Sequence, residues 1–235
     1  MKNSVSEIYL NDEYADKNSA FGDDEADWKS QNVVKMFERH NLKPKSIVEV
    51  GCAGGGILLK VVEKSGEVIR AVGYEPGPKP FALAQSRETE VVKFINDTLT
   101  SNVDDDFDIV LCLDVFEHVE DYFEFLRGLK KVGGNYVFHI PLDMNVQMVA
   151  RQKPIQHVRD KVGHLHYFSK ETALESLKHC GYTVEDWFYT CAVESNYNGG
   201  FKFKMMNIIR KLLFTISPDV SVRFLGGSSL MVYAK

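Results

Sequence analysis

A glycine-rich segment directly after a short apolar run carries the strongest chemical signal in this chain. Glu49-Val50 leads into Gly51-Cys52-Ala53-Gly54-Gly55-Gly56, and a helical pattern begins at Ile57. Glycines at a strand-to-helix turn permit a tight turn and a close approach of ligand to backbone. Three consecutive glycines at a helix start weaken that helix, so a ligand explains them better than an ordinary turn does. The segment therefore predicts a cofactor-binding loop.

Two classes of cofactor suit such a loop, and Ala53 helps to separate them. In the dinucleotide fingerprint, the second glycine lets the backbone approach a pyrophosphate. Ala53 places a methyl group at that position, which favours a ligand without pyrophosphate. Glu75, at the end of the next expected strand, suits the two ribose hydroxyls of either cofactor class. A nicotinamide-dependent oxidoreductase stays open as the alternative, although no Tyr-x-x-x-Lys pattern is evident.

Histidines supply the candidate acid–base chemistry. His164 and His166 lie on the same side of their segment if it is extended, and an imidazole is well suited to accept a proton near neutral pH. Ordinary loop histidines are the other interpretation. The pair lacks a cysteine or acidic companion at ligand spacing, and Glu117-His118 does not form the His-Glu-x-x-His zinc pattern. The sequence therefore predicts no metal site.

The elements that must position these residues follow a β–α rhythm from Ser46 onward. Near-continuous Val, Ile and Leu content suits strands covered by helices on both faces, which predicts a doubly wound α/β sheet. The expected strands are Ser46–Val50, Ile69–Tyr74, Val91–Ile95, Asp108–Leu113, Tyr136–Ile140, Tyr182–Tyr189 and Ser229–Tyr233. The expected helices are Gly55–Lys64, Pro78–Arg87, Glu120–Lys131 and a segment from Ser169 to Gly181.

Length and composition indicate a single domain over residues 1–235, with 44% hydrophobic residues to build a core. Within it we expect an N-terminal lid or helix at 1–44, a core at 46–191 and 228–235, and an insertion at 192–227. Residues 142–167 form another insertion. Insertions at the strand ends of an α/β sheet usually build the binding site.

Charge and hydropathy bear on partners and location. A net charge of -5 disfavours nucleic acid as a partner. The N-terminus lacks the apolar region of a signal peptide, and no run of transmembrane length occurs, so we expect a cytoplasmic protein. The widely spaced cysteines are typical of free thiols. The stretch Phe201–Ile216 has a broad apolar face and also contains Lys202, Lys204, Arg210 and Lys211. We expect this stretch to cover the pocket or pack into the core instead of lying on a membrane surface.

Four motifs, in order, resemble those of class I S-adenosylmethionine-dependent methyltransferases. They are Glu49–Gly56, Gly73–Pro76, Asn96-Asp97 and Phe107–Val119. The resemblance covers about Ser46 to Pro141. It implies a Rossmann-like, seven-stranded sheet that is mostly parallel with a reversed last strand, and it implies S-adenosylmethionine as the cofactor.

The same resemblance implies roles for particular residues. The glycine loop would support the methionine moiety, Glu75 would hold the ribose, and Asp97 would face the adenine amino group. The segment around Leu113-Asp114 would flank the sulfonium. Asp97 and Asp114 also have an alternative interpretation as caps of the turn or helix that follows each. The predicted cofactor contacts are Glu49, Gly51, Cys52, Ala53, Gly54, Gly55, Glu75, Pro76, Asp97, Leu113 and Asp114.

The expected activity is methyl transfer to a small-molecule acceptor. In overall layout the chain resembles bacterial small-molecule and glycan-precursor O-methyltransferases. The preferred acceptor is therefore a sugar hydroxyl on a nucleotide sugar or polysaccharide precursor. His166 is favoured as the proton acceptor over His164, because the adjoining Tyr167-Phe168 and helix start could fix its ring. His118 is the third candidate for this role. A methyltransferase-like binding protein without turnover is a further alternative.

Overall fold

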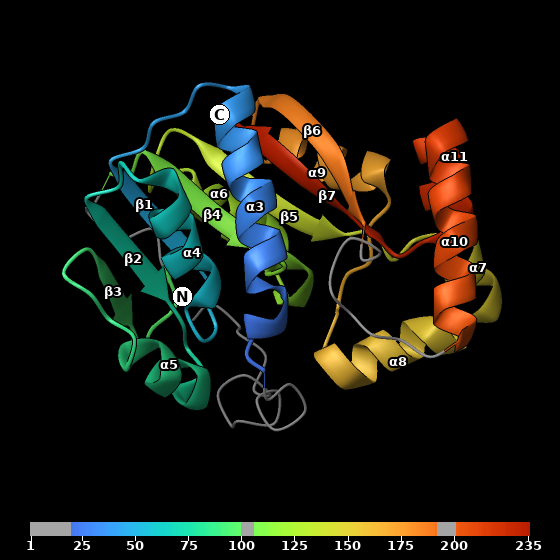
Figure 1. Ribbon diagram of the computed structural model, residues 1–235, viewed down its shortest axis with the longest axis horizontal. Coiled ribbons are helices and arrows are strands. Elements are labelled where there is room, and N and C mark those ends of the chain that lie inside the picture. Colours follow the sequence, from blue (N-terminus) through green and yellow to red (C-terminus); the bar gives the residue numbers. More distant parts are fainter. Residues whose placement is uncertain (1–19, 100–105, 192–200) are drawn as a thin grey trace.

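The computed structural model describes residues 20–99, 106–191 and 201–235 (Figure 1). Residues 1–19 of the expected N-terminal lid lie outside the described residues. So do 192–200 of the expected insertion and the predicted side-chain roles of Phe201, Lys202 and Lys204. The described elements are arranged as a central sheet with helices on both of its faces.

The sheet contains seven strands in the order β3-β2-β1-β4-β5-β7-β6. β1 to β5 pair in parallel, whereas β7 runs antiparallel to both β5 and β6, which confirms the expected reversed last strand. Each expected strand exists, and its bounds shift by at most two residues. The strands are β1 (Ser46–Val50), β2 (Arg70–Tyr74), β3 (Val92–Ile95), β4 (Ile109–Leu113), β5 (Tyr136–Pro141), β6 (Val184–Cys191) and β7 (Ser228–Ala234).

Two apolar clusters, one on each face of the sheet, hold the helices in place. One cluster includes buried residues of α3 (Asp23–Arg39), α4 (Gly56–Ser65) and α5 (Pro78–Gln85). The other includes buried residues of α6 (Tyr122–Leu129) and α9 (Lys170–His179). Because both faces are covered, the central strands are buried almost throughout, as their apolar sequences require.

Side-chain caps define where the helices begin. The Ser169 hydroxyl accepts a hydrogen bond from the Thr172 amide, and the Thr172 hydroxyl accepts one from the Ser169 amide, which forms a capping box at the start of α9. The Asp121 carboxylate caps α6 by accepting from the Glu124 amide at 3.0 Å. Asp121 therefore takes the capping role that was the alternative interpretation of Asp114.

Both expected insertions contain helices, which gather beyond one end of the sheet (Figure 1). Residues 142–167 hold α7 (Val146–Arg151) and α8 (Lys153–Val162), which the sequence analysis left without helices. The later insertion holds α10 (Phe201–Ile216) and α11 (Pro218–Leu225). α11 contacts both α7 and α10, so the two insertions form one group of helices.

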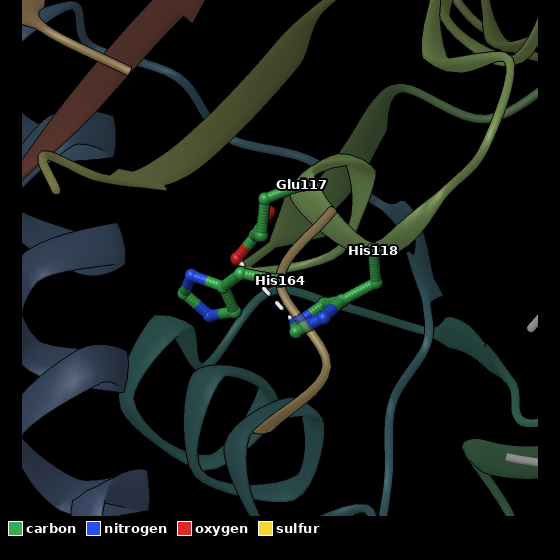
Figure 2. Close-up of side chains that lie close together, drawn as sticks. All are labelled: Glu117, His118 and His164. Atoms are coloured by element: carbon green, nitrogen blue, oxygen red, sulfur yellow. Dashed lines mark ion pairs between the residues drawn. The ribbon is translucent and has the colours of Figure 1, made fainter. Parts of the chain in front are cut away.

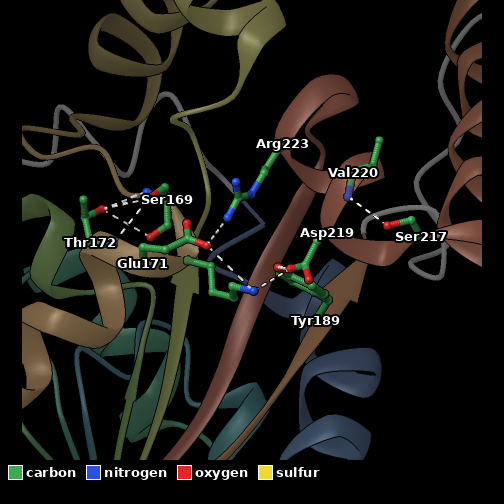
Figure 3. Close-up of polar contacts among 9 residues, drawn as sticks. Ser169, Glu171, Thr172, Tyr189, Ser217, Asp219, Val220 and Arg223 are labelled. Atoms are coloured by element: carbon green, nitrogen blue, oxygen red, sulfur yellow. Dashed lines mark hydrogen bonds and ion pairs between the residues drawn. The ribbon is translucent and has the colours of Figure 1, made fainter.

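Polar contacts fasten this group to the core (Figure 3). On α11, the Asp219 carboxylate pairs with Lys170 Nζ at 2.5 Å and accepts a hydrogen bond from the Tyr189 hydroxyl of β6. Arg223 of α11 donates to the Glu171 carboxylate of α9. These contacts join α11 to two core elements and so fix the position of the insertion.

The prediction that the apolar face of α10 packs into the core is wrong. The side chains of Ile208, Leu212 and Ile216 are 61%, 64% and 81% exposed. Elsewhere on the same helix, Arg210 donates two hydrogen bonds to the Leu225 carbonyl of α11 and lines a cavity. None of the helices in the described part of the chain combines the length and apolar character needed to cross a bilayer.

Candidate active site

The glycine-rich turn between β1 and α4 is wound through left-handed backbone conformations. Gly51, Ala53 and Gly55 have φ angles of 65°, 48° and 77°. A Cβ on Gly51 would lie 2.9 Å from Val115 Cγ2, so glycine is required there by both space and conformation. Ala53 adopts a conformation that costs a non-glycine residue roughly 1–2 kcal/mol. The turn thus keeps a strained shape at the carboxyl end of β1.

The Glu75 carboxylate, just after β2, holds this turn from the side. It accepts hydrogen bonds from the Ala53 amide at 2.9 Å and from the Gly77 amide at 2.7 Å. Burial raises the pKa of Glu75 to about 7, and the two amides oppose this shift. Each carboxylate oxygen keeps a further lone pair, which can accept a hydrogen bond from a ligand hydroxyl.

A cavity adjoins the turn, and we call it the glycine-loop cavity. Of the predicted cofactor contacts, Gly51, Ala53, Glu75, Pro76, Asp97 and Asp114 line it, whereas Glu49, Cys52, Gly54, Gly55 and Leu113 do not. Asp97 also caps the following turn, because its carboxylate accepts from the Thr98 amide at 2.7 Å. His118, the third candidate for proton acceptor, also lines the cavity. The other lining residues were not predicted as site residues; they are Phe21, Val50, Tyr74, Pro80, Thr98, Leu99, Val115, Val119 and Phe125.

The electrostatic character of the glycine-loop cavity discriminates between ligands. Its described lining has three carboxylates, those of Glu75, Asp97 and Asp114, and neither lysine nor arginine. Such a lining repels a pyrophosphate but suits a ribose diol and the positive charges of a sulfonium and an ammonium group. Apolar side chains make up much of the remaining wall and suit a purine ring. The groups that line this cavity therefore fit S-adenosylmethionine.

Phe21 forms part of the wall of this cavity. Its carbonyl accepts a hydrogen bond from the Gly54 amide at 3.3 Å, and its side chain is among the lining groups. The cavity volume is about 130 Å³, below the roughly 300–1,000 Å³ of typical ligand pockets. A nucleoside-sized ligand therefore needs a wider cavity than this one, so some of its walls must move apart.

Glu49 lies behind the turn and is almost completely buried. Its Oε2 atom has no hydrogen-bond partner among the described residues, while the Leu58 amide binds the carboxylate. Burial raises the pKa of Glu49 to about 8, against the attraction of the Lys29 ammonium group. A side chain with this pKa gains or loses its proton at a pH well above the range in which an exposed glutamate does so.

This raised pKa predicts that the ligand-free protein loses stability as pH rises. The contribution of Glu49 is fully present below its unfolded pKa near 4.5 and is lost as pH rises through about 8. Between these values the free energy of unfolding should fall by about 1.4 kcal/mol per pH unit for this group. Urea unfolding at pH 5.5, 6.5 and 7.5 measures how the free energy of unfolding depends on pH. In Glu49→Gln this slope should be smaller by that amount. Parallel slopes for parent and variant would contradict the assignment.

A buried chain of polar groups fixes Asp114 after β4. Its carboxylate pairs with Lys29 Nζ of α3 at 2.6 Å and with His139 Nδ1 of β5 at 2.7 Å, and His139 Nε2 meets the Thr190 hydroxyl at 2.8 Å. Burial alone would raise the pKa of Asp114, but these two neighbours hold it below its usual range. Asp114 itself has a φ of 54°, which this network maintains.

A second, larger cavity lies between the core and the inserted helices, and we call it the insertion cavity. Its volume is about 560 Å³, which falls in the range of small-molecule sites. Its lining includes Trp28, Met148 and Leu225 as well as charged side chains. Asp114 and His118 line both cavities, so the two cavities meet at a shared wall.

The three candidate histidines have different surroundings. His164 lines the insertion cavity, and its Nδ1 lies 2.7 Å from Asp143 Oδ2. His166 Nε2 donates to the backbone carbonyls of Val119 and Glu120 at 3.0 and 3.2 Å. Burial, reinforced by the nearby His164, lowers the pKa of His118 to about 3, so this ring is neutral.

Comparison with known proteins places this chain in a family. A family model described as a methyltransferase domain matches residues 23–186, which is most of the chain. The chain belongs to this methyltransferase family. The match favours this family over the nicotinamide-dependent alternative and implies S-adenosylmethionine as the cofactor. The cofactor motifs that the sequence analysis singled out all lie within the matched residues.

Curated relatives of this methyltransferase include a ubiquinone biosynthesis O-methyltransferase of Pseudomonas fluorescens (strain SBW25), 33% identical over 110 residues. That alignment covers 43% of this chain and 46% of the relative, so the chain spans about half the length of the curated relatives it matches.

Solved structures share the fold. A putative methyltransferase in a complex with the Haloferax volcanii Trm112 activator has 14% identity and a TM-score of 0.66, over 98% of this chain and 96% of that one. Magnesium protoporphyrin IX methyltransferase from Synechocystis, with bound S-adenosylhomocysteine, has 13% identity and a TM-score of 0.59, over 88% and 82%.

Sequence reasoning missed three functional candidates of this methyltransferase: Lys29, His139 and Asp143. One of them had a local signal, because His139 is a polar residue within the apolar strand expected at Tyr136–Ile140. Lys29 is one of several charged residues on an amphipathic helix, and Asp143 lies in an insertion without a pattern. Their contacts with Asp114 and His164 join segments far apart in the chain.

Proposed function

We propose that this methyltransferase methylates a hydroxyl oxygen of a small molecule held in the insertion cavity. One observation carries the proposal: the cavity suited to the cofactor and a cavity large enough for an acceptor meet at Asp114 and His118. A transfer between two bound molecules needs such a junction, because proximity and alignment supply much of the catalysis.

The residues around the glycine-loop cavity would hold and orient the cofactor. When bound, S-adenosylmethionine supplies an electrophilic methyl group and leaves as S-adenosylhomocysteine. Glu75 would accept hydrogen bonds from the ribose hydroxyls, and Asp97 would face the adenine. Asp114, fixed by Lys29 and His139, would set the wall beside the reacting groups.

His164 is the histidine best placed to assist a hydroxyl acceptor. A carboxylate only accepts hydrogen bonds, so Asp143 selects the tautomer with a proton on Nδ1 and leaves a lone pair on Nε2. That nitrogen can accept the proton of an acceptor in the insertion cavity. In His166, the corresponding nitrogen already donates to two carbonyls. The geometry thus favours His164 over His166.

Oxygen is proposed as the methylated atom because the curated relatives are named O-methyltransferases. The sugar or glycan acceptor expected from the sequence has no support in the comparisons. The insertion cavity mixes aromatic and apolar side chains with charged ones of both signs, among them Arg151, Arg210 and Asp143. This lining suits an acceptor that has both an apolar part and polar groups.

A screen for methylated product tests this function. The chain and S-adenosylmethionine are incubated separately with phenolic acids, nucleotide sugars and amines, and mass spectrometry follows the gain of one methyl group. We expect a phenolic or sugar hydroxyl to gain the methyl and S-adenosylhomocysteine to appear in equal amount. Methylation confined to amines would contradict the proposed oxygen specificity.

Cofactor binding provides an independent check of the same site. Calorimetry should give affinity in about the micromolar range for S-adenosylhomocysteine and no comparable affinity for NAD, because the carboxylate-lined cavity repels a pyrophosphate. Tighter binding of NAD would contradict the placement of the cofactor.

A further inference from the structure

Three potential metal ligands from two distant segments converge at the wall of the insertion cavity (Figure 2). Glu117 and His118 belong to a short 3₁₀ helix at Phe116–His118, and His164 follows α8. One ligand atom from each of the three residues lies within 4.8 Å of the other two. His118 Nε2 is 3.7 Å from Glu117 Oε1, and the two imidazole rings are 4.7 Å apart between centroids.

The Glu117 carboxylate is the unusual member of this cluster. Its side chain is fully buried, and neither of its oxygens has a hydrogen-bond partner among the described residues. Glu117 is directed toward the two histidines in Figure 2. A buried carboxyl group without hydrogen bonds costs about 1–3 kcal/mol, and its charged form is disfavoured unless a cation lies beside it. A bound cation would remove that cost.

We propose that Glu117, His118 and His164 bind one divalent transition-metal ion at the wall between the cavities, and that this ion holds the acceptor hydroxyl. One carboxylate and two imidazoles form a donor set suited to Zn²⁺, Mn²⁺ or Fe²⁺. Ligands of one such ion lie about 3–3.5 Å apart, given bonds of about 2.1 Å. The three atoms lie within 4.8 Å of one another, so binding the ion would draw them closer together.

Asp143 supports this assignment from behind His164. Its carboxylate lies 2.7 Å from Nδ1 and fixes the ring so that Nε2 presents its lone pair. A metal-binding histidine commonly donates its other N–H to a carboxylate in this way. The sequence analysis predicted no metal, because the histidine pair has no cysteine or acidic companion at ligand spacing in the sequence. The fold supplies two: Glu117 as a ligand and Asp143 as a support.

The inference rests on the proposed function and changes how the acceptor is activated. With three protein ligands, the ion keeps a coordination position for the acceptor oxygen, and coordination lowers the pKa of the bound hydroxyl. The O–H bond breaks and the proton passes to water in the cavity. The electron pair left on oxygen forms the bond to the methyl carbon, while the carbon–sulfur bond breaks with its pair on sulfur. His164 then acts as a ligand instead of a base.

Metal binding is tested on the full chain without acceptor, after treatment with a chelator. Calorimetry with Zn²⁺ and with Mn²⁺ should show one site per chain for at least one of these ions. Glu117→Gln and His164→Asn should weaken it by at least 100-fold, and Asp143→Asn by about 10-fold. Glu120→Gln is the matched control, because it removes an exposed carboxylate from the same segment and should leave the affinity unchanged.

A second readout keeps the test independent of variant folding. Co²⁺ added to the parent chain should give the visible absorption bands of an ion bound by nitrogen and oxygen ligands, and Zn²⁺ should displace it. Each variant is compared only if its binding of S-adenosylhomocysteine matches the parent. Lack of binding by the parent, or Glu117→Gln binding as tightly as the parent, would overturn the site.

Turnover distinguishes this inference from the proposed function. With an acceptor from the screen, removal of the ion should lower turnover at least 100-fold, and adding it back should restore the rate. Full turnover by the ion-free chain would overturn the role of the ion while the methyltransferase function stands. Ion binding without methylation of any hydroxyl would instead count against the proposed function, and with it against the acceptor role of the ion.

Discussion

Replacing His164 with asparagine is expected to lower turnover on the acceptor by about 10²–10⁴-fold and to leave the affinity for S-adenosylhomocysteine nearly unchanged. The substitution removes the Nε2 lone pair of a side chain that lines the insertion cavity, whereas His164 is not part of the lining of the glycine-loop cavity. Steady-state kinetics and calorimetry measure the two quantities. The loss is expected whether the lone pair accepts a proton or binds an ion, and the metal titrations separate these cases.

His166→Asn is the matched comparison for His164→Asn. The His166 ring donates to two backbone carbonyls and packs against Tyr122, with 4.7 Å between ring centroids. Its replacement should therefore cost about 1 kcal/mol of stability and change turnover by only a few-fold. If His166→Asn lowers turnover as much as His164→Asn without unfolding the chain, the preference for His164 is wrong. If neither variant affects turnover, both histidines are structural.

Replacing Glu75 with alanine is expected to weaken binding of S-adenosylhomocysteine by about 1–3 kcal/mol, or about 5- to 150-fold. The variant loses the acceptor for the ribose hydroxyls and the two hydrogen bonds that hold the Ala53 and Gly77 amides. Asp97→Ala should have a smaller effect, because Asp97 is exposed and also caps a turn. Unchanged affinity of Glu75→Ala, with an unchanged melting curve, would show that the cofactor lies elsewhere.

The same residue predicts how cofactor affinity depends on pH. With a pKa raised to about 7, Glu75 is mostly protonated at pH 6 and mostly ionised at pH 8. Only the ionised form accepts hydrogen bonds with both oxygens, so affinity should fall about tenfold from pH 8 to pH 6. Calorimetry across this range checks the slope, and Glu75→Ala should lose it. A slope of equal size in the variant would assign it to another group.

The sequence by itself determined the sheet, the position of the glycine-rich turn and the order of the motifs. These features depend on local chemistry: apolar runs of strand length, caps such as Ser169, and glycines where the backbone must adopt a positive φ. Parallel strands place their carboxyl ends at one edge, so the neighbourhood of Gly51, Glu75 and Asp114 followed from the strand assignment alone.

The tertiary structure alone decided how the polar side chains pair within the site. Lys29 reaches Asp114 only because α3 packs across the sheet, and Glu117 meets His164 only because the segment after α8 returns to the end of β4. The insertion cavity likewise depends on how α7, α8, α10 and α11 pack together. Such contacts join residues far apart in the chain, and their geometry is set by packing of whole elements, which no local pattern of residues encodes.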